Sequence, residues 1–204
     1  MISFNCEGMK RNQSYLKNIL SNLKPKIIFL QEIWLPYSEH STLDKLHPEY
    51  SFKISTPDMF TQPEDLLGAQ GHDWHGVAIG WRREISACVT QLAPTCDRVT
   101  GIKLPLKERS ILLLSYYAPT AGHDEDFRDS ICSLTELLLL HSSPGDQIVH
   151  GADSNCSSKS SGRRKIAWEY FCTRFQSTSH LDHPFTIIMV SLSPILTSSQ
   201  HPPT

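Results

Sequence analysis

Polar side chains of the kinds that bind metal ions and phosphates stand directly after four apolar runs of this 204-residue sequence. They are Asn5, Gln31-Glu32, Tyr116-Tyr117 and Asp153-Ser154-Asn155. A polar residue at the end of a strand is often only a turn signal. Four such groups, each following an apolar run, instead predict a pocket whose rim is built from the ends of separate strands.

The residue types in these groups agree with one chemistry. Glu32 offers a hard oxygen ligand suited to Mg²⁺ or Mn²⁺, and Asp153 could orient or deprotonate a water molecule. Asn5, Asn155 and the Tyr117 hydroxyl could hydrogen-bond phosphate oxygens without adding negative charge. This combination is the one that metal-assisted attack of water on a phosphodiester needs.

Other candidate ligands carry less weight. His72 and His75 could suggest a zinc pair, but no further ligands accompany them, so we interpret them as histidines of a surface loop. The six cysteines include no Cys-x-x-Cys pair, which favours free thiols in a reducing compartment.

Positive charge gathers late in the chain, where residues 159–174 include five basic residues and one acidic residue. One interpretation is a solvated helix face, and the other is contact with nucleic-acid phosphates by Arg163, Arg164 and Lys165. The formal net charge of −2 argues against a protein that coats DNA generally. It is compatible with an enzyme that binds nucleic acid locally.

The spacing of apolar residues predicts the elements that must position these groups. Strands are expected at 2–4, 26–32, 50–54, 76–81, 85–92, 98–104, 110–117 and 147–150. Amphipathic helices are expected over 12–23, 127–138 and 162–175. Residues 55–74, with several prolines and glycines, read as a long surface loop.

This order of elements predicts a mixed α+β domain with two sheets face to face and helices on both outer faces. Hydrophobic residues make up 39% of the chain and charged residues 20%, which excludes disorder by composition. No apolar run approaches the ~20 residues of a membrane span, so no membrane association is expected. No signal peptide is expected either, which predicts an intracellular protein that is not secreted.

Five short segments together resemble the endonuclease/exonuclease/phosphatase superfamily, in its order and at about its spacing. They are ISFNCEG at 2–8, IIFLQE at 27–32, HGVAIGW at 75–81, LLSYYAP at 113–119 and GADSN at 151–155. Within that superfamily the sequence is most similar to the AP-endonuclease-like domain of non-LTR retrotransposons, through LSYYAPT and the GRRK helix after GADSN. The resemblance extends over residues 2–186.

The resemblance implies a four-layer αββα sandwich, a divalent metal ion, and nicking of DNA to leave a 3′-hydroxyl that primes reverse transcription. Asn5 and Glu32 resemble the metal-side residues, and Tyr117 resembles a phosphate-contacting tyrosine. Asp153 resembles the aspartate that activates water, with Asn155 as its partner at the scissile phosphate. A reverse transcriptase is expected in the parent element, although this chain contains none.

Two departures from the family pattern affect the expected activity. Ala152 stands where the family has a glycine directly before the catalytic aspartate, and Gly151 comes one residue earlier. The family also closes with a Ser-Asp-His type motif, for which Asp182-His183 is a poor counterpart because it follows the third predicted helix directly. We therefore expect the last strands of the fold and a phosphate-stabilising histidine to be missing, and DNA nicking to be weak or absent.

The last eighteen residues, 187–204, contain none of the 40 charged residues of the chain. We predict an incomplete endonuclease/exonuclease/phosphatase domain over 1–186, followed by a non-homologous tail that a shift of reading frame near Thr186 would explain. The nucleotide sequence from codon 186, read in all three frames, tests this hypothesis.

Three functions remain open from the sequence. The first is a divalent-metal-dependent DNA endonuclease of retrotransposon type, nuclear if it functions and impaired by the missing closing motif. The second is a non-catalytic remnant that at most binds nucleic acid. The third is a phosphodiesterase or phosphatase of the same superfamily that acts on a lipid or small-molecule phosphate.

Overall fold

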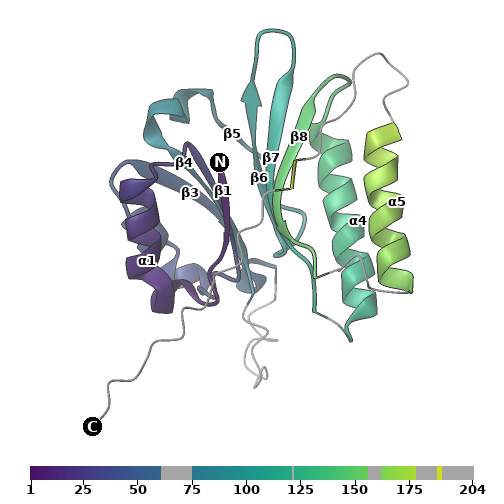
Figure 1. The fold of residues 1–204 in the computed structure, drawn as a ribbon, viewed down its shortest axis with the longest axis horizontal. Helices are drawn as coiled ribbons and strands as arrows, with labels where there is room; N and C mark the ends of the chain where they lie inside the picture. Colours follow the sequence, from purple (N-terminus) through teal and green to yellow (C-terminus); the bar gives the residue numbers. More distant parts are fainter. Residues whose placement is uncertain (61–74, 121, 156–161, 178–187, 190–204) are drawn as a thin grey trace.

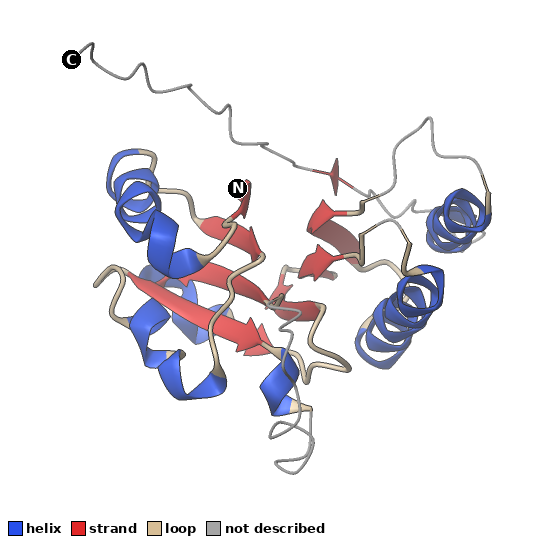
Figure 2. Ribbon diagram, turned by 90° about the horizontal axis from the view of Figure 1, so that it is seen from below, coloured by secondary structure: helices blue, strands red, loops and turns tan. Residues whose placement is uncertain are grey.

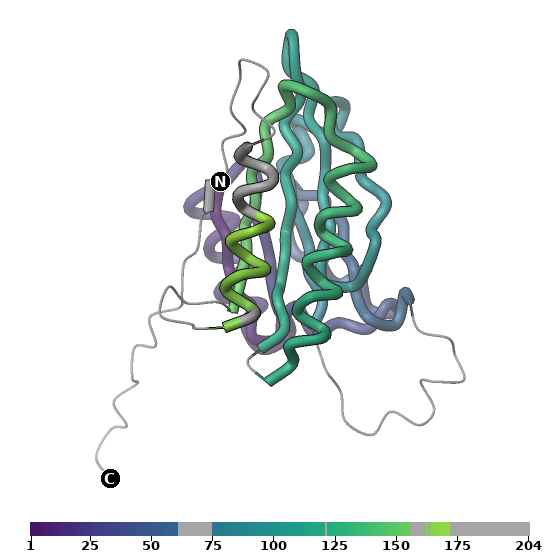
Figure 3. The backbone as a smooth tube through the Cα atoms, turned by 90° about the vertical axis from the view of Figure 1, so that its right-hand side faces the viewer, coloured from purple at the N-terminus to yellow at the C-terminus, as the bar shows by residue number. Residues whose placement is uncertain are grey.

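Two β-sheets lie face to face in the computed structural model, which describes residues 1–60, 75–120, 122–155, 162–177 and 188–189. Helix α1 (Met9–Asn22) covers the outer face of one sheet, and α4 (Asp124–His141) and α5 (Arg163–Ser177) cover the other (Figures 1 and 2). Figure 3 shows α4 and α5 side by side across the second sheet. The predicted α+β sandwich with helices on both outer faces is thereby confirmed.

Both sheets contain parallel pairs of strands, one in the first sheet and two in the second. The first sheet has the order β1-β2-β4-β3, with bounds Ile2–Asn5, Ile27–Gln31, Val77–Arg82 and Tyr50–Ser55. The second has the order β5-β6-β7-β8-β9, with bounds Thr90–Gln91, Val99–Pro105, Ser110–Tyr117, Gln147–Asp153 and Ile188–Met189. β1 runs parallel to β2, and β7 and β9 run parallel to β8. Parallel strands bring their carboxyl ends to the same edge of a sheet, which is where the candidate site lies.

Three apolar clusters hold the layers together. One lies between α1 and the first sheet, and another between the second sheet and α4–α5. The third fills the space between the sheets and includes Phe29, Trp81, Ile102, Leu113 and Val149. Continuous apolar strands such as β2, which is buried along its whole length, are the pattern expected of a sheet covered on both faces.

The strand predicted over 85–92 is wrong. Residues Arg83–Cys88 form a 3₁₀ helix, η3, and only Thr90–Gln91 form a strand. Contacts with neighbouring elements favour this turn, because the Trp81 indole N–H donates to Ser86 Oγ at 3.0 Å and the Arg83 amide donates to Glu49 O at 2.8 Å. Three further short elements, η1 (Tyr37–Glu39), α2 (Ser41–Asp44) and η2 (Pro57–Met59), lie between β2 and β4.

The segment predicted to be a foreign tail contributes to the second sheet. Ile188 and Met189 form β9, which pairs with Val149 and His150 of β8. Residues 187 and 190–204 lie outside the described residues, and the frameshift hypothesis stays a prediction. No helix within the described part of the chain is long and apolar enough to cross a membrane.

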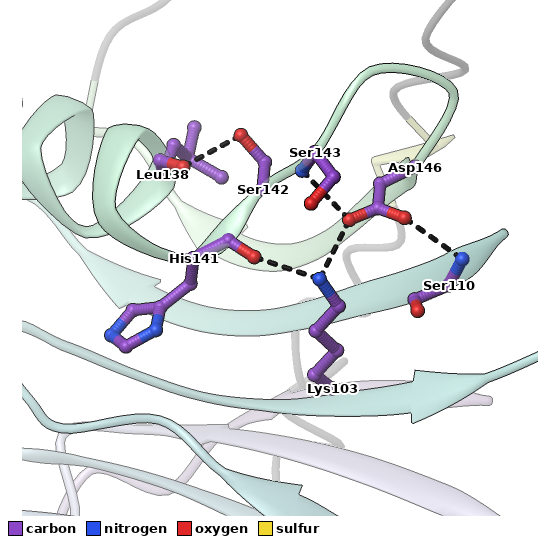
Figure 4. Close-up of polar contacts among 7 residues, drawn as sticks. All are labelled: Lys103, Ser110, Leu138, His141, Ser142, Ser143 and Asp146. Atoms are coloured by element: carbon purple, nitrogen blue, oxygen red, sulfur yellow. Dashed lines mark hydrogen bonds and ion pairs between the residues drawn. The ribbon is translucent and has the colours of Figure 1, made fainter.

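The end of the second sheet far from the candidate site is fixed by a buried carboxylate (Figure 4). Asp146, only 5% exposed, accepts from the backbone N–H groups of Ser110 at 2.8 Å and Ser143 at 2.9 Å. Lys103 Nζ lies 2.8 Å from the same carboxylate and also donates to His141 O at the end of α4. This cluster joins β6, β7 and α4 immediately before β8 begins, and so helps to set the register that delivers Asp153 to the other end.

Replacing Asp146 by asparagine is expected to lower the free energy of unfolding by about 2 kcal/mol at neutral pH, because the charge-assisted hydrogen bonds are lost. Burial alone would raise the pKa of Asp146, but its hydrogen bonds from Lys103, Ser143 and Ser110 hold that pKa below the ordinary value. The stabilisation is therefore present above pH ~4 and is lost as pH falls through the lowered pKa. Urea titrations of both proteins at several pH values test this, and a difference that persists unchanged at pH 2 would contradict it.

Candidate active site

The carboxyl ends of the parallel pairs β1–β2 and β7–β8 meet at one edge of the sandwich. Asn5 ends β1 beside Gln31 of β2, and Tyr117 ends β7 beside Asp153 of β8. The strands stay linked one residue further, because Cys6 N–H donates to Gln31 O at 2.8 Å and Ala118 N–H donates to Asp153 O at 2.9 Å. The polar residues that follow the apolar runs thus emerge together, at what we call the mouth of the sandwich.

The mouth is organised around the side-chain amide of Asn5. Its nitrogen Nδ2 donates to Glu32 Oε1 at 2.8 Å and to Asp153 Oδ2 at 3.2 Å. Its oxygen Oδ1 accepts from the Glu7 backbone N–H at 3.0 Å, which determines which way the amide faces. Two carboxylates from different sheets, both half-buried, are therefore within hydrogen-bonding distance of a single nitrogen atom.

Tyr117 and Asn155 lie beside this pair. Burial, followed by the charge and hydrogen bonding of Glu32 and the charge of Asp153, raises the pKa of Tyr117 to about 12. The phenol consequently keeps its proton at neutral pH and remains a hydrogen-bond donor. Asn155 donates from its backbone to Asp153 Oδ1 at 3.1 Å and from Nδ2 to Ala118 O at 2.6 Å, which ties the loop after β8 to the loop after β7.

Backbone strain is concentrated at the mouth. Among the described residues, five that are not glycine have positive φ, and four of them stand next to the strand ends just described. These four are Glu7 (43°), Glu32 (52°), Trp34 (50°) and Asn155 (44°). Such conformations are costly for residues with a Cβ and gather at functional sites, where the surrounding structure imposes them.

A buried network of polar side chains lies between the two sheets next to the mouth. Gln31 Nε2 donates to Ser115 Oγ and to Gly151 O, both at 3.1 Å, and so connects the two sheets. Ser3 and Ser115 complete it by donating to Gln31 Oε1 and to Leu30 O. Because Gln31 is 2% exposed, this network is structural, and it fixes the position of the neighbouring Glu32.

Three residues on the β4–β6 side of the mouth were not predicted to belong to it: the sequence analysis placed His75 in a surface loop and did not consider Asp97 or Arg98. His75 Nε2 and Asp97 Oδ2 form a close hydrogen-bonding contact between the two sheets. The Arg98 guanidinium lies 5.8 Å from the centre of the Tyr117 ring, and Arg98 O accepts from the Tyr117 backbone N–H at 3.0 Å. Arg98 could have been found by the reasoning used for the other groups, since it begins a predicted strand antiparallel to 110–117.

The structure places Arg164 of α5 against α4. The Arg164 guanidinium donates to Pro119 O, lies 3.6 Å from Asp124 Oδ1 and is centred 4.4 Å from the Phe127 ring. Its side chain is only 12% exposed. Lys165 is more open and pairs with Glu169 at 3.7 Å, while the Arg163 side chain lies outside the described residues.

Several candidates from the sequence fall outside the described part of the chain. His72 is among them, and so is the Asp182-His183 pair considered for the closing motif. The expectation of a missing phosphate-stabilising histidine therefore stays a prediction.

The donor set of the mouth fits a hard divalent cation. Carboxylates and amide oxygens are ligands that Mg²⁺ and Mn²⁺ accept, and Mg²⁺ in particular keeps several water molecules and needs few protein ligands. In this structure the nitrogen of the Asn5 amide faces the two carboxylates, and its oxygen accepts from the Glu7 N–H. Among the described residues no group of three or more His, Cys, Asp or Glu side chains is arranged to hold a metal ion. A cation beside Glu32 would thus depend largely on water, and Asn5 would join it as a ligand with its amide turned so that Oδ1 faces the carboxylate.

The structure thus combines a two-sheet sandwich with two carboxylates at the ends of its parallel strands. The model of the Endonuclease/Exonuclease/phosphatase family matches residues 2–184, and the chain belongs to that family. The family is generally divalent-metal dependent, which agrees with the donor set of the mouth.

Solved structures share this fold at low sequence identity. The endonuclease domain of TRAS1, a telomere-specific non-LTR retrotransposon, has 16% identity and a TM-score of 0.55, over 84% of this chain and 68% of that one. AP endonuclease LMAP from Leishmania major has 14% identity and a TM-score of 0.56, over 85% and 66%. This chain thus spans about two thirds of the length of each. The search of curated proteins finds no match.

Proposed function

We propose that this protein hydrolyses phosphodiester bonds of DNA with the help of Mg²⁺ or Mn²⁺, as an endonuclease of the non-LTR retrotransposon type. The observation that carries the proposal is the Asn5 amide, which holds Glu32 and Asp153 at one point of the mouth. The likeness of the fold to a retrotransposon endonuclease domain and to an AP endonuclease favours DNA as the substrate.

Each residue of the mouth would have a distinct part in this reaction. Glu32 and Asn5 would hold the cation, which when bound supplies charge neutralisation at the phosphate. Asp153 would orient the attacking water and accept its proton, while its Oδ1 is held by the backbone N–H of Asn155. Tyr117, protonated at neutral pH, would donate to a phosphate oxygen.

Conversion of supercoiled plasmid to the nicked form tests the proposal. We expect slow nicking that requires Mg²⁺ or Mn²⁺, stops with a chelator, and exceeds the background of a Glu32→Gln variant. Ligation of the nicked product after phosphatase and kinase treatments identifies which end carries the phosphate. Nicking that is equal in the protein and the variant would refute metal-dependent hydrolysis at this mouth.

Assays of DNA binding and of hydrolysis of other phosphates, run beside the nicking assay, decide between the remaining functions. DNA binding without nicking would favour the non-catalytic nucleic-acid-binding alternative, and hydrolysis restricted to lipid or small-molecule phosphates would favour a phosphodiesterase or phosphatase of the same superfamily. Contact of Arg163, Arg164 and Lys165 with DNA remains a proposal. It is tested by the salt dependence of binding after charge reversal, with Lys165→Glu the least disruptive change because Arg164 packs on α4.

A further inference from the structure

A large aromatic side chain stands exposed beside the candidate metal residue. Trp34 is 38% exposed and follows Glu32 by two residues, so its Cα is within about 7 Å of the Glu32 Cα. Its neighbours in sequence are buried, with Ile33 at 0% and Leu35 at 2% exposure. Trp34 is thus the one residue of this segment, 33–35, that faces solvent, and it does so at the mouth.

The Trp34 ring packs against the backbone at Gly8, which fixes its position. A Cβ atom added to Gly8 would stand 2.7 Å from Trp34 Cε3, so the indole packs directly on the Gly8 backbone and no larger residue fits there. Gly8 N–H in turn donates to Glu32 O at 2.9 Å, and Met9 N–H donates to Ile33 O at 2.9 Å. The ring and the candidate metal residue are therefore attached to the same backbone framework.

Maintaining this position costs backbone strain. Trp34 has φ of 50° and Glu32 has φ of 52°, both in the left-handed region that residues with a Cβ rarely adopt. Because 38% of Trp34 is exposed, part of its large apolar surface does not gain the free energy that burial would provide. Strain of this kind, next to a cluster of functional groups, indicates that the ring serves a ligand.

The surroundings of Trp34 favour a flat, polar-edged ligand over an acyl chain. Lys10, two residues after the Gly8 on which the ring packs, forms an ion pair with Glu39 of η1, five residues after Trp34, with Nζ and Oε2 2.6 Å apart. Glu32, two residues before Trp34 in the chain, accepts a hydrogen bond from the side-chain amide of Asn5. A nucleobase fits this setting, because its π face stacks on an aromatic ring while its polar edges remain in water.

We propose that Trp34 stacks on the nucleobase of the nucleotide next to the scissile phosphate, so that the mouth selects nucleotide phosphodiesters over lipid or sugar phosphates. The inference rests on the proposed function, because it takes the phosphate to lie beside Glu32 and Asp153. Stacking on a base is tolerant of sequence, so Trp34 would select the class of substrate without reading a particular base.

Binding of uncleaved ligands tests the inference without requiring turnover. The affinities of thymidine 5′-monophosphate and 2-deoxyribose 5-phosphate, which differ only by the base, are measured with Mg²⁺ by calorimetry. We expect the nucleotide to bind about 5- to 150-fold more tightly, the range that one base–aromatic stack supplies. Trp34→Leu should abolish this ratio, and Trp34→Phe should retain part of it. Tyr170→Leu, which alters an aromatic that is 66% exposed on α5, should leave it unchanged.

Equal affinities in the unaltered protein, or a ratio that survives in Trp34→Leu, would overturn the inference. Tighter binding of dodecyl phosphate than of the nucleotide would overturn it in favour of an acyl ligand. If Trp34→Leu does not fold, the indole N–H resonance of Trp34 in the unaltered protein decides, since it must shift with the nucleotide and not with the sugar phosphate. A base preference without plasmid nicking would retain this inference and refute the proposed hydrolysis.

Discussion

Replacing Glu32 by glutamine is expected to weaken divalent-metal binding strongly and to reduce metal-dependent hydrolysis on the order of 10³-fold. The substitution preserves the size of the side chain and an oxygen that can accept from Asn5 Nδ2, but it removes the negative charge that a hard cation requires. The loss corresponds to several kcal/mol of charge stabilisation that the cation supplies to the reaction. Plasmid nicking measures the rate, and Tb³⁺ luminescence measures metal binding without turnover.

Glu39→Gln is the matched control for this change. Glu39 lies seven residues further along the chain in η1 and pairs on the surface with Lys10. Because that ion pair is exposed, its loss should cost at most about 1 kcal/mol of stability and leave metal affinity unchanged. Equal metal affinity in Glu32→Gln and Glu39→Gln would show that the cation binds elsewhere.

Replacing Asp153 by asparagine is expected to reduce the hydrolysis rate by about 10²- to 10⁴-fold, the range for loss of a general base. Asparagine retains an oxygen that can accept from the Asn155 backbone N–H, so the loop after β8 should keep its position. Metal affinity should fall less than in Glu32→Gln. The two variants would then separate metal binding from activation of water.

The kinetic signature of Asp153→Asn is a lowered kcat with little change in KM, measured with a fluorescent oligonucleotide at saturating metal. Asp129→Asn, on the exposed face of α4, serves as the control and should retain the full rate. A rate for Asp153→Asn within twofold of the control would exclude Asp153 as the residue that activates water.

The apolar periodicity of the sequence determined most of the architecture and the identity of the mouth residues. Asn5, Glu32, Tyr117 and Asp153 each follow or end an apolar run, and the ends of parallel strands meet at one edge of a sheet. Local spacing is sufficient for such predictions because burial of alternate or continuous apolar residues decides whether a segment forms a strand.

The partners of those residues were decided only by the tertiary structure. Asn5 contacts Glu32 and Asp153, which are 27 and 148 residues away in sequence, and no local pattern specifies a contact between residues so far apart. His75 and Asp97 meet for the same reason, because β4 and β6 belong to different sheets that face each other. His75, which the sequence analysis interpreted as a loop histidine, therefore takes part in a contact between the sheets.

Packing also decided details that depend on which neighbour a residue meets. A Cβ at Gly151 would stand 2.4 Å from Phe29 of the facing sheet, so glycine is required there, whereas Ala152 packs on the opposite side of β8. The positive charge of Arg164 suggested contact with DNA phosphates. In the structure its guanidinium contacts Pro119 O and Asp124 Oδ1. Sequence shows which groups a chain carries, whereas the direction in which a long side chain points depends on the energies of contacts that exist only after folding.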